Sequence, residues 1–103
     1  MSCIGIIYVA HNPRDGKNIY KVGKTSRKLD ERMKELSSDT TNLGKYTAEA
    51  WITVNDVHLA EQKCHDCLSK YRVQKDREFF ELPLDVLIAE LKSVLKPFRV
   101  EDK

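Results

Sequence analysis

The sequence contains little glycine, proline or cysteine: four Gly, three Pro and three Cys among 103 residues. This composition excludes a collagen-like or low-complexity chain, and an odd, small number of cysteines argues against a disulfide-stapled scaffold. No hydrophobic run reaches the ~18 residues of a membrane span. The opening MSCIGIIYVAHN also lacks the basic segment and the small-residue cleavage site of a secretory signal. We therefore expect reduced thiols, a cytoplasmic location and no membrane partner.

A nucleotide-binding P-loop is also missing. Gly23-Lys24-Thr25 matches the end of that motif, which requires another glycine five positions before the first of these residues. Asn18 occupies that position, and the nearest preceding glycine, Gly16, lies two places too early. Without the glycine-rich turn, successive backbone N–H groups cannot wrap a triphosphate. The Gly-Lys-Thr triplet therefore predicts no P-loop.

The composition is otherwise that of an ordinary globular chain, with 41% hydrophobic and 33% charged residues. Its length predicts a single domain over residues 1–103. The net charge of +2 is unevenly distributed, because residues 17–34 carry seven Lys and Arg against two acidic residues and the rest of the chain is net negative. This asymmetry indicates a basic face suited to phosphate. A helix with a solvated charged face is the alternative.

Alternating apolar residues predict a β-hairpin over residues 3–24, with the turn-rich HNPRDGKN between its two strands. Side chains alternate between the two faces of a strand, so the pattern also sorts the hairpin residues. The expected inner face carries Ile7, Val9, Tyr20 and Val22, and the other face carries Tyr8, Lys21 and Gly23.

Beyond residue 24 the apolar spacing changes to a helical one. It predicts a helix over about 28–37 with Ser26 as its cap, a loop through SSDTTNLGK, a strand in YTAEAWITV and a second helix over about 57–71. DREFFEL is expected to be a short hydrophobic return segment, and a third helix runs from Pro83 to Pro97. The order β-β-α-β-α-α predicts an α+β fold with a three-stranded antiparallel sheet flanked by helices.

Cys64 and Cys67 form a Cys-x-x-Cys pair, which can indicate zinc or thiol chemistry. A closed zinc site needs two further ligands, and Cys64 falls on the apolar stripe of the predicted second helix. We therefore interpret the pair as core thiols, with a zinc or thiol-dependent interaction protein as the alternative. We also expect Trp51 to pack in the core rather than to stack on bases. Glu78 is expected to be a structural carboxylate rather than a catalytic one.

Glu61 and His65 lie four residues apart on another face of the second helix, so their side chains are neighbours. A carboxylate beside an imidazole can hold a divalent ion or relay protons. An exposed acidic residue beside an ordinary histidine is the alternative.

The combination of motifs resembles the GIY-YIG nuclease superfamily, in its compact phage-type and bacterial branch. The matching features are Ile6-Ile7-Tyr8, Lys21-Val22-Gly23-Lys24-Thr25, a helix containing Arg32 and a later helix containing Glu61. The resemblance covers about residues 4–95. It implies a metal-dependent endonuclease that hydrolyses or nicks phosphodiester bonds in DNA with Mg²⁺ or Mn²⁺. Since we expect no second domain to read sequence, the enzyme should be weakly specific or depend on a homodimer or a targeting partner.

Residue by residue, the resemblance assigns catalytic roles to Tyr8, Lys21, Arg32 and Glu61, with Glu61 as the metal ligand. It assigns nucleic-acid binding to Lys24, Arg27, Lys28 and His65. The sequence departs from the family at three positions: Ile6, where a glycine is usual, Lys21, where a tyrosine is usual, and Leu36, where a tyrosine or histidine is frequent. These departures keep an alternative open, namely a nucleic-acid-binding module of the same fold with weak or no catalysis.

Overall fold

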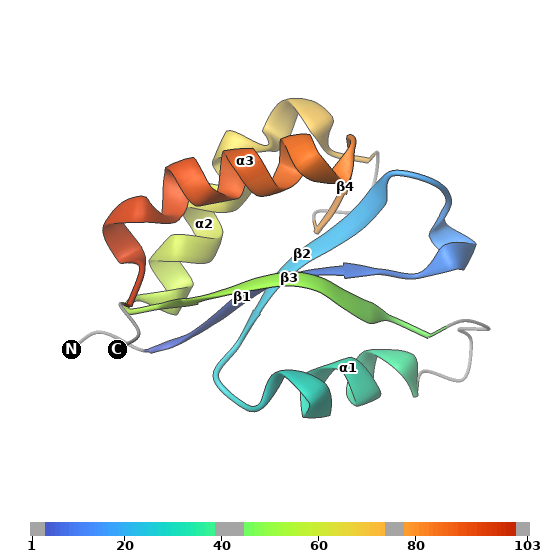
Figure 1. Ribbon diagram of the computed structural model, residues 1–103, viewed down its shortest axis with the longest axis horizontal. Coiled ribbons are helices and arrows are strands. Elements are labelled where there is room, and N and C mark those ends of the chain that lie inside the picture. Colours follow the sequence, from blue (N-terminus) through green and yellow to red (C-terminus); the bar gives the residue numbers. More distant parts are fainter. Residues whose placement is uncertain (1–3, 39–44, 74–77, 101–103) are drawn as a thin grey trace.

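The computed structural model describes residues 4–38, 45–73 and 78–100 (Figure 1). Cys3 and most of the predicted SSDTTNLGK loop lie outside these ranges. The elements, in chain order, are β1 (Gly5–His11), β2 (Ile19–Thr25), α1 (Leu29–Ser37), β3 (Thr47–Val54), α2 (Val57–Cys67), β4 (Phe79–Glu81) and α3 (Leu84–Leu95). Short 3₁₀ turns occupy Pro13–Asp15, Ser69–Tyr71 and Lys96–Phe98. Among the described residues, no helix combines the length and the apolar character needed to cross a membrane.

The sheet has four strands in the order β3-β1-β2-β4, and each neighbouring pair is antiparallel. The central strand β1 places Tyr8 opposite Gly23 of β2 on one side and opposite Trp51 of β3 on the other. In Figure 1, α1 lies on one face of the sheet, and α2 and α3 cover the opposite face.

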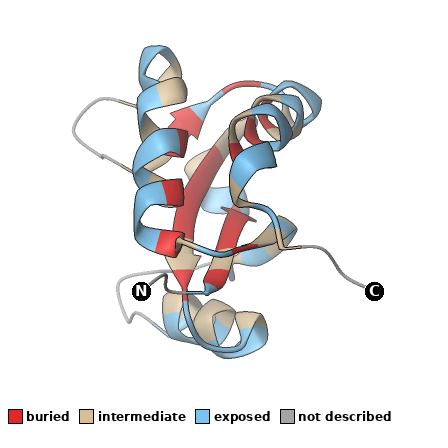
Figure 2. Cartoon of the chain, turned by 90° about the vertical axis from the view of Figure 1, so that its left-hand side faces the viewer, coloured by how far each residue is buried: buried red, intermediate tan, exposed pale blue. Residues whose placement is uncertain are grey.

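The core lies between the sheet and the α2–α3 layer. Ile7, Val9, Tyr20 and Val22 belong to it, as the alternation predicted. Figure 2 shows buried residues on the strands and on the inward sides of α2 and α3, whereas α1 contains no fully buried residue. The two faces of the sheet are therefore unequal, since one is packed against two helices and the other against a single, half-buried helix.

The expected three-stranded sheet is wrong, because Phe79–Glu81 forms a fourth strand. It pairs with β2 through Lys21↔Phe79 and Ile19↔Glu81, and Phe80 is fully buried. Three residues are too few for periodicity to identify a strand. The partner strand lies about sixty positions earlier, so only the tertiary structure reveals the pairing.

Helix positions agree with the sequence pattern, but two helix ends do not. The N-cap of α1 is Lys28, without a capping side chain, in place of the predicted Ser26. The second helix ends at Cys67, and the expected last turn is a 3₁₀ turn, Ser69–Tyr71. Asp56 is the N-cap of α2, since its carboxylate accepts a hydrogen bond from the Leu59 backbone N–H at 3.4 Å.

Cys64 is fully buried in the core, as predicted, and burial raises the pKa of its thiol to about 12. A thiol held protonated in this way is a poor nucleophile and metal ligand. The prediction for Trp51 is wrong, because this residue is 56% exposed. It lies on the edge strand β3, and its pairing with Tyr8 directs it to the face away from α2 and α3.

Replacing Phe80 by alanine should destabilise the protein strongly, because the substitution opens a cavity where β4 meets the core. We expect a loss of about 3–5 kcal/mol in the free energy of unfolding, measured by urea denaturation. Phe79→Ala is the matched control, since Phe79 is only half-buried, and it should cost markedly less. Equal losses for the two variants would contradict the placement of β4.

Candidate active site and nucleic-acid interface

Tyr8 lies on the face of the sheet that α1 covers, and it is fully buried. Its side chain crosses toward β2 and occupies the space above Gly23. A Cβ atom built on Gly23 would lie 2.6 Å from Tyr8 Oη and 2.8 Å from Tyr8 Cζ. The absence of a side chain at Gly23 is therefore what permits Tyr8 to lie in this position.

Arg32 connects α1 to this tyrosine. Its Nε–H donates to Tyr8 Oη at 3.2 Å, and its Nη1 donates to Glu35 one turn further along the helix at 3.1 Å. The hydrogen bond to Tyr8, followed by the interaction with Glu35, raises the pKa of Arg32 against the opposing effect of burial. With 30% of its side chain exposed, the guanidinium is oriented by two partners and still accessible.

Lys21 is bound by Glu78, which immediately precedes β4. The ammonium group donates to Glu78 Oε1 and lies 5.5 Å from the centre of the Phe79 ring. Burial alone would raise the pKa of Glu78, but the hydrogen bond and charge of Lys21, with smaller contributions from His65 and Arg32, lower it overall. The Glu78 carboxylate therefore offsets the positive charge of the Lys21 ammonium at the site.

Glu61 lies on the opposite side of the sheet from Tyr8. The register places Lys24 opposite Ile7, so Lys24 extends toward α2, where its ammonium donates to Glu61 Oε1 at 2.6 Å. The side chains are 34% exposed for Lys24 and 16% for Glu61. The structure thus groups Tyr8 with Arg32, and Glu61 with Lys24, as two separate pairs on opposite faces of the sheet rather than in one pocket.

An open groove of about 330 Å³ at the end of β2 is lined by one member of each pair, Arg32 and Lys24. It runs between the β2–α1 connection and the first turn of α2. Its lining residues are Lys24, Thr25, Ser26, Arg27, Arg32, Val57 and His58. Three of them are permanent cations, and Glu35 pairs with both Arg27 and Arg32, so the groove combines positive charge with orienting carboxylates. Such a surface suits a phosphate backbone.

A family model described as the T5orf172 domain matches residues 5–96. The chain belongs to the T5orf172 domain family. No curated protein and no solved structure matches it. The family is a distinct one of the HNH/GIY-YIG-like endonuclease type, and it is associated with nuclease-like and DNA-binding function.

Membership of the GIY-YIG superfamily, which the motifs implied, is therefore wrong, since it is the T5orf172 model that matches. The two departures in the motifs agree with this result. Ile6 stands where the first motif needs glycine, and Lys21 stands where the second needs tyrosine. In this T5orf172 domain the residue at that second position is an ion-paired lysine rather than a free phenol.

His65 and Lys28 contribute less directly to the groove. The Nε2–H of His65 donates to the backbone carbonyl of Val22 at 2.9 Å, and its ring lies 5.4 Å from that of Phe80. His65 therefore attaches α2 to β2. Lys28 is exposed at the start of α1, beside the groove-lining Arg27.

The donor groups of the T5orf172 site fit a magnesium ion only in a restricted way. The described residues contain no group of three or more His, Cys, Asp or Glu side chains that could enclose a metal. Mg²⁺, however, is commonly held by one or two carboxylates together with substrate phosphates and water. Glu61, partly exposed beside the groove, could serve as such a carboxylate once a phosphate is present.

Sequence reasoning missed Glu35 and His58, and it did not identify Lys21 as the partner of Glu78. Glu35 follows Arg32 by three residues, a spacing that brings side chains together on a helix and could have revealed the pair. The partners Lys21 and Glu78 are 57 positions apart, and no local pattern connects them. His58 enters the groove only because the start of α2 lies against the β2–α1 connection.

Glu78→Gln should destabilise the protein near neutral pH, because it leaves the Lys21 ammonium buried without a carboxylate. We expect a loss of about 1–2 kcal/mol, less than for a fully buried pair because the Glu78 side chain is 45% exposed. A carboxyl with a lowered pKa stabilises the fold above its unfolded-state pKa. The difference from wild type should therefore shrink as the pH falls below about 4.

Denaturation curves at pH 7 and pH 3 measure this effect. Glu81→Gln is the matched control, since Glu81 is exposed three residues away, and it should change little at either pH. If Glu78→Gln lowers the free energy of unfolding as much at pH 3 as at pH 7, the ion-pair explanation is contradicted.

Proposed function

We propose that this T5orf172 domain is an endonuclease that hydrolyses phosphodiester bonds in DNA. The observation that supports this most is the hydrogen bond from Arg32 to Tyr8 at the edge of a cationic groove, in a family associated with nucleases. The hydrogen bond sets a charged group and a hydroxyl in a fixed relation beside a surface suited to phosphate.

The groove cations would bind the DNA backbone first. Lys24, Arg27 and Arg32 line one continuous concavity, so consecutive phosphates can each meet a cation. Arginine can also hold two phosphate oxygens at once, which fixes the orientation of the strand. Contacts of this kind position the backbone without reading sequence, so we infer weak intrinsic specificity and targeting through a partner or a second copy.

Arg32 and Tyr8 would then act on the phosphate to be cleaved. The guanidinium can offset the negative charge that accumulates on phosphate oxygens in the transition state, and Tyr8 and Glu35 already orient it for this purpose. The Tyr8 hydroxyl accepts from Arg32, so the buried phenol would hold the guanidinium in place at the phosphate. Lys21 would add positive charge moderated by Glu78.

Glu61 would hold the divalent cation, Mg²⁺ or Mn²⁺. When bound, the ion supplies Lewis-acid stabilisation of charge on the phosphate. In the structure, Lys24 Nζ donates a hydrogen bond to Glu61 Oε1 at 2.6 Å, so the carboxylate is already paired. Phosphate binding by Lys24 would therefore release this carboxylate, so that substrate and metal bind together.

Nicking of supercoiled plasmid in the presence of Mg²⁺ or Mn²⁺ tests the proposal. Arg32→Ala and Glu61→Ala should each reduce the nicking rate by at least a hundredfold, because each removes charge stabilisation from the transition state. Tyr8→Phe should also lower the rate while conserving the buried ring.

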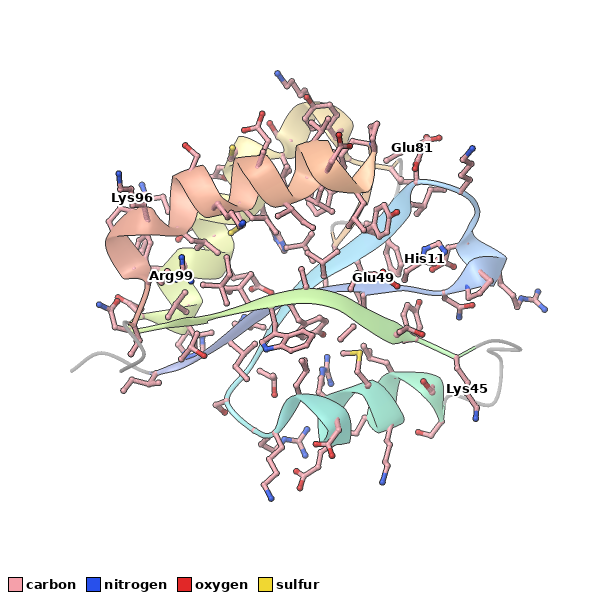
Figure 3. The ribbon with its side chains drawn as sticks, viewed as in Figure 1. His11, Lys45, Glu49, Glu81, Lys96 and Arg99 are labelled. Atoms are coloured by element: carbon pink, nitrogen blue, oxygen red, sulfur yellow. The ribbon has the colours of Figure 1, made fainter. Side chains whose placement is uncertain are left out.

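The matched controls are Arg14→Ala, in the turn at the far end of the hairpin, and Glu81→Ala. Figure 3 shows Glu81 on the side of the sheet away from α1. Both controls should nick at the wild-type rate. Wild-type protein that cuts under neither metal, or site variants that cut normally, would contradict the proposal.

A binding module without catalysis is the second candidate, and the ion pairs favour it specifically. Lys21 and Glu61 are both engaged by partners of opposite charge, and the Tyr8 side chain is fully buried. These are properties of a stable surface that binds phosphate without a free acid or base.

Binding to a short DNA duplex should weaken steeply as salt rises from 50 to 200 mM, because bound phosphates release counterions. Removing one contact by Arg27→Ala should lower the slope of log K against log salt by about one, and Arg14→Ala should leave it unchanged. An unchanged slope for Arg27→Ala would exclude this groove as the interface. Binding without nicking would identify the module.

A further inference from the structure

Trp51 is a large aromatic side chain left in water. It is the only tryptophan in the chain, it lies within β3, and it is 56% exposed. Exposed tryptophans that are not needed for packing often mark binding surfaces, because the indole provides a large rigid contact area. The core already contains its aromatic residues, Tyr20 and Phe80, on the other face of the sheet.

The position of Trp51 relates it to the groove. Trp51 pairs with Tyr8, and Tyr8 pairs with Gly23, so the three residues form a row across β3, β1 and β2 on the face that α1 covers. Adjacent strands lie about 4.8 Å apart. The Tyr8 side chain extends toward Gly23 and Arg32, away from β3. Trp51 is thus two strand spacings from Gly23, and its neighbour Tyr8 contacts the groove-lining Arg32.

We propose that Trp51 stacks on an unpaired base of the nucleic acid whose phosphates lie in the groove. This inference rests on the proposed function. A base extends sideways from its own backbone, so a strand held by Arg32 can present one to an aromatic ring on a neighbouring strand of the sheet. Stacking on an indole is tolerant of sequence, because every base has a π-face.

The substrate class follows from this placement. In an intact duplex the bases are stacked on one another and paired, so they cannot also stack on Trp51 without being extruded, which costs energy. The chain should therefore prefer single-stranded or frayed nucleic acid to a blunt duplex of the same charge.

The test uses the fluorescence of the single tryptophan and three ligands: an oligothymidylate, a duplex of equal length and an abasic oligomer with the same number of phosphates. The oligothymidylate should quench Trp51 and bind roughly five- to hundredfold more tightly than the abasic oligomer. The abasic oligomer should bind with the same salt dependence but leave the fluorescence unchanged.

Variants separate the indole from the phosphate contacts. Trp51→Ala should abolish the preference for bases and retain binding of the abasic oligomer, and Trp51→Phe should keep part of the preference. Leu59→Ala is the matched control, since Leu59 is 40% exposed on α2, and it should behave as wild type. Circular dichroism verifies folding, and Trp51→Phe carries the test if the alanine variant does not fold.

Three results would overturn the inference. Equal affinity for oligothymidylate and abasic oligomer would refute stacking while leaving phosphate binding intact. Binding of none of the three ligands would refute the proposed function and this inference with it. A Trp51→Ala variant that converts a dimer to a monomer but keeps the base preference would assign Trp51 to an interface between copies of this chain.

Discussion

The site depends on one close approach, the crossing of Tyr8 over Gly23. The phenol occupies space that any other residue at position 23 would fill, and its hydroxyl accepts the hydrogen bond that connects α1 to the sheet. Arg32 is thereby placed over the end of β2, where the chain turns toward the groove. Without that crossing, the arginine would have no fixed partner on the sheet, and the groove would lose one wall.

Electrostatic pairing organises the rest of the site. The Lys and Arg side chains that line the groove each have a carboxylate partner: Lys24 has Glu61, and Arg27 and Arg32 share Glu35. Lys21, outside the groove, has Glu78. A phosphate that enters must therefore exchange partners with these carboxylates rather than meet bare charge.

The sequence pattern correctly predicted the features that depend on residues close together along the chain. The alternation in the hairpin correctly separated Val22 from Tyr8, and the helical stripe correctly buried Cys64. The failures share a different cause. The strand β4, the Lys21–Glu78 pair and the exposure of Trp51 all depend on which distant segments become neighbours, and a one-dimensional period carries no such information. The family assignment failed for a related reason, because short motifs with substitutions at Ile6 and Lys21 describe a site less fully than a model of the whole chain.

The absence of fully buried residues in α1 has a consequence for how the site is assembled. A helix that contributes little to the core can detach at a small cost in free energy while the sheet and the α2–α3 layer stay folded. Since α1 carries Arg32 and Glu35, its detachment would dismantle one side of the groove and its return would rebuild it. The same weak anchoring gives a nucleic acid a means of ordering the protein: a backbone bridging Arg32 on α1 and Lys24 on β2 would fasten the helix to the sheet. Nucleic acid bound in the groove would then slow the amide hydrogen exchange of the nine residues Leu29–Ser37 and leave the exchange rates of the core unchanged.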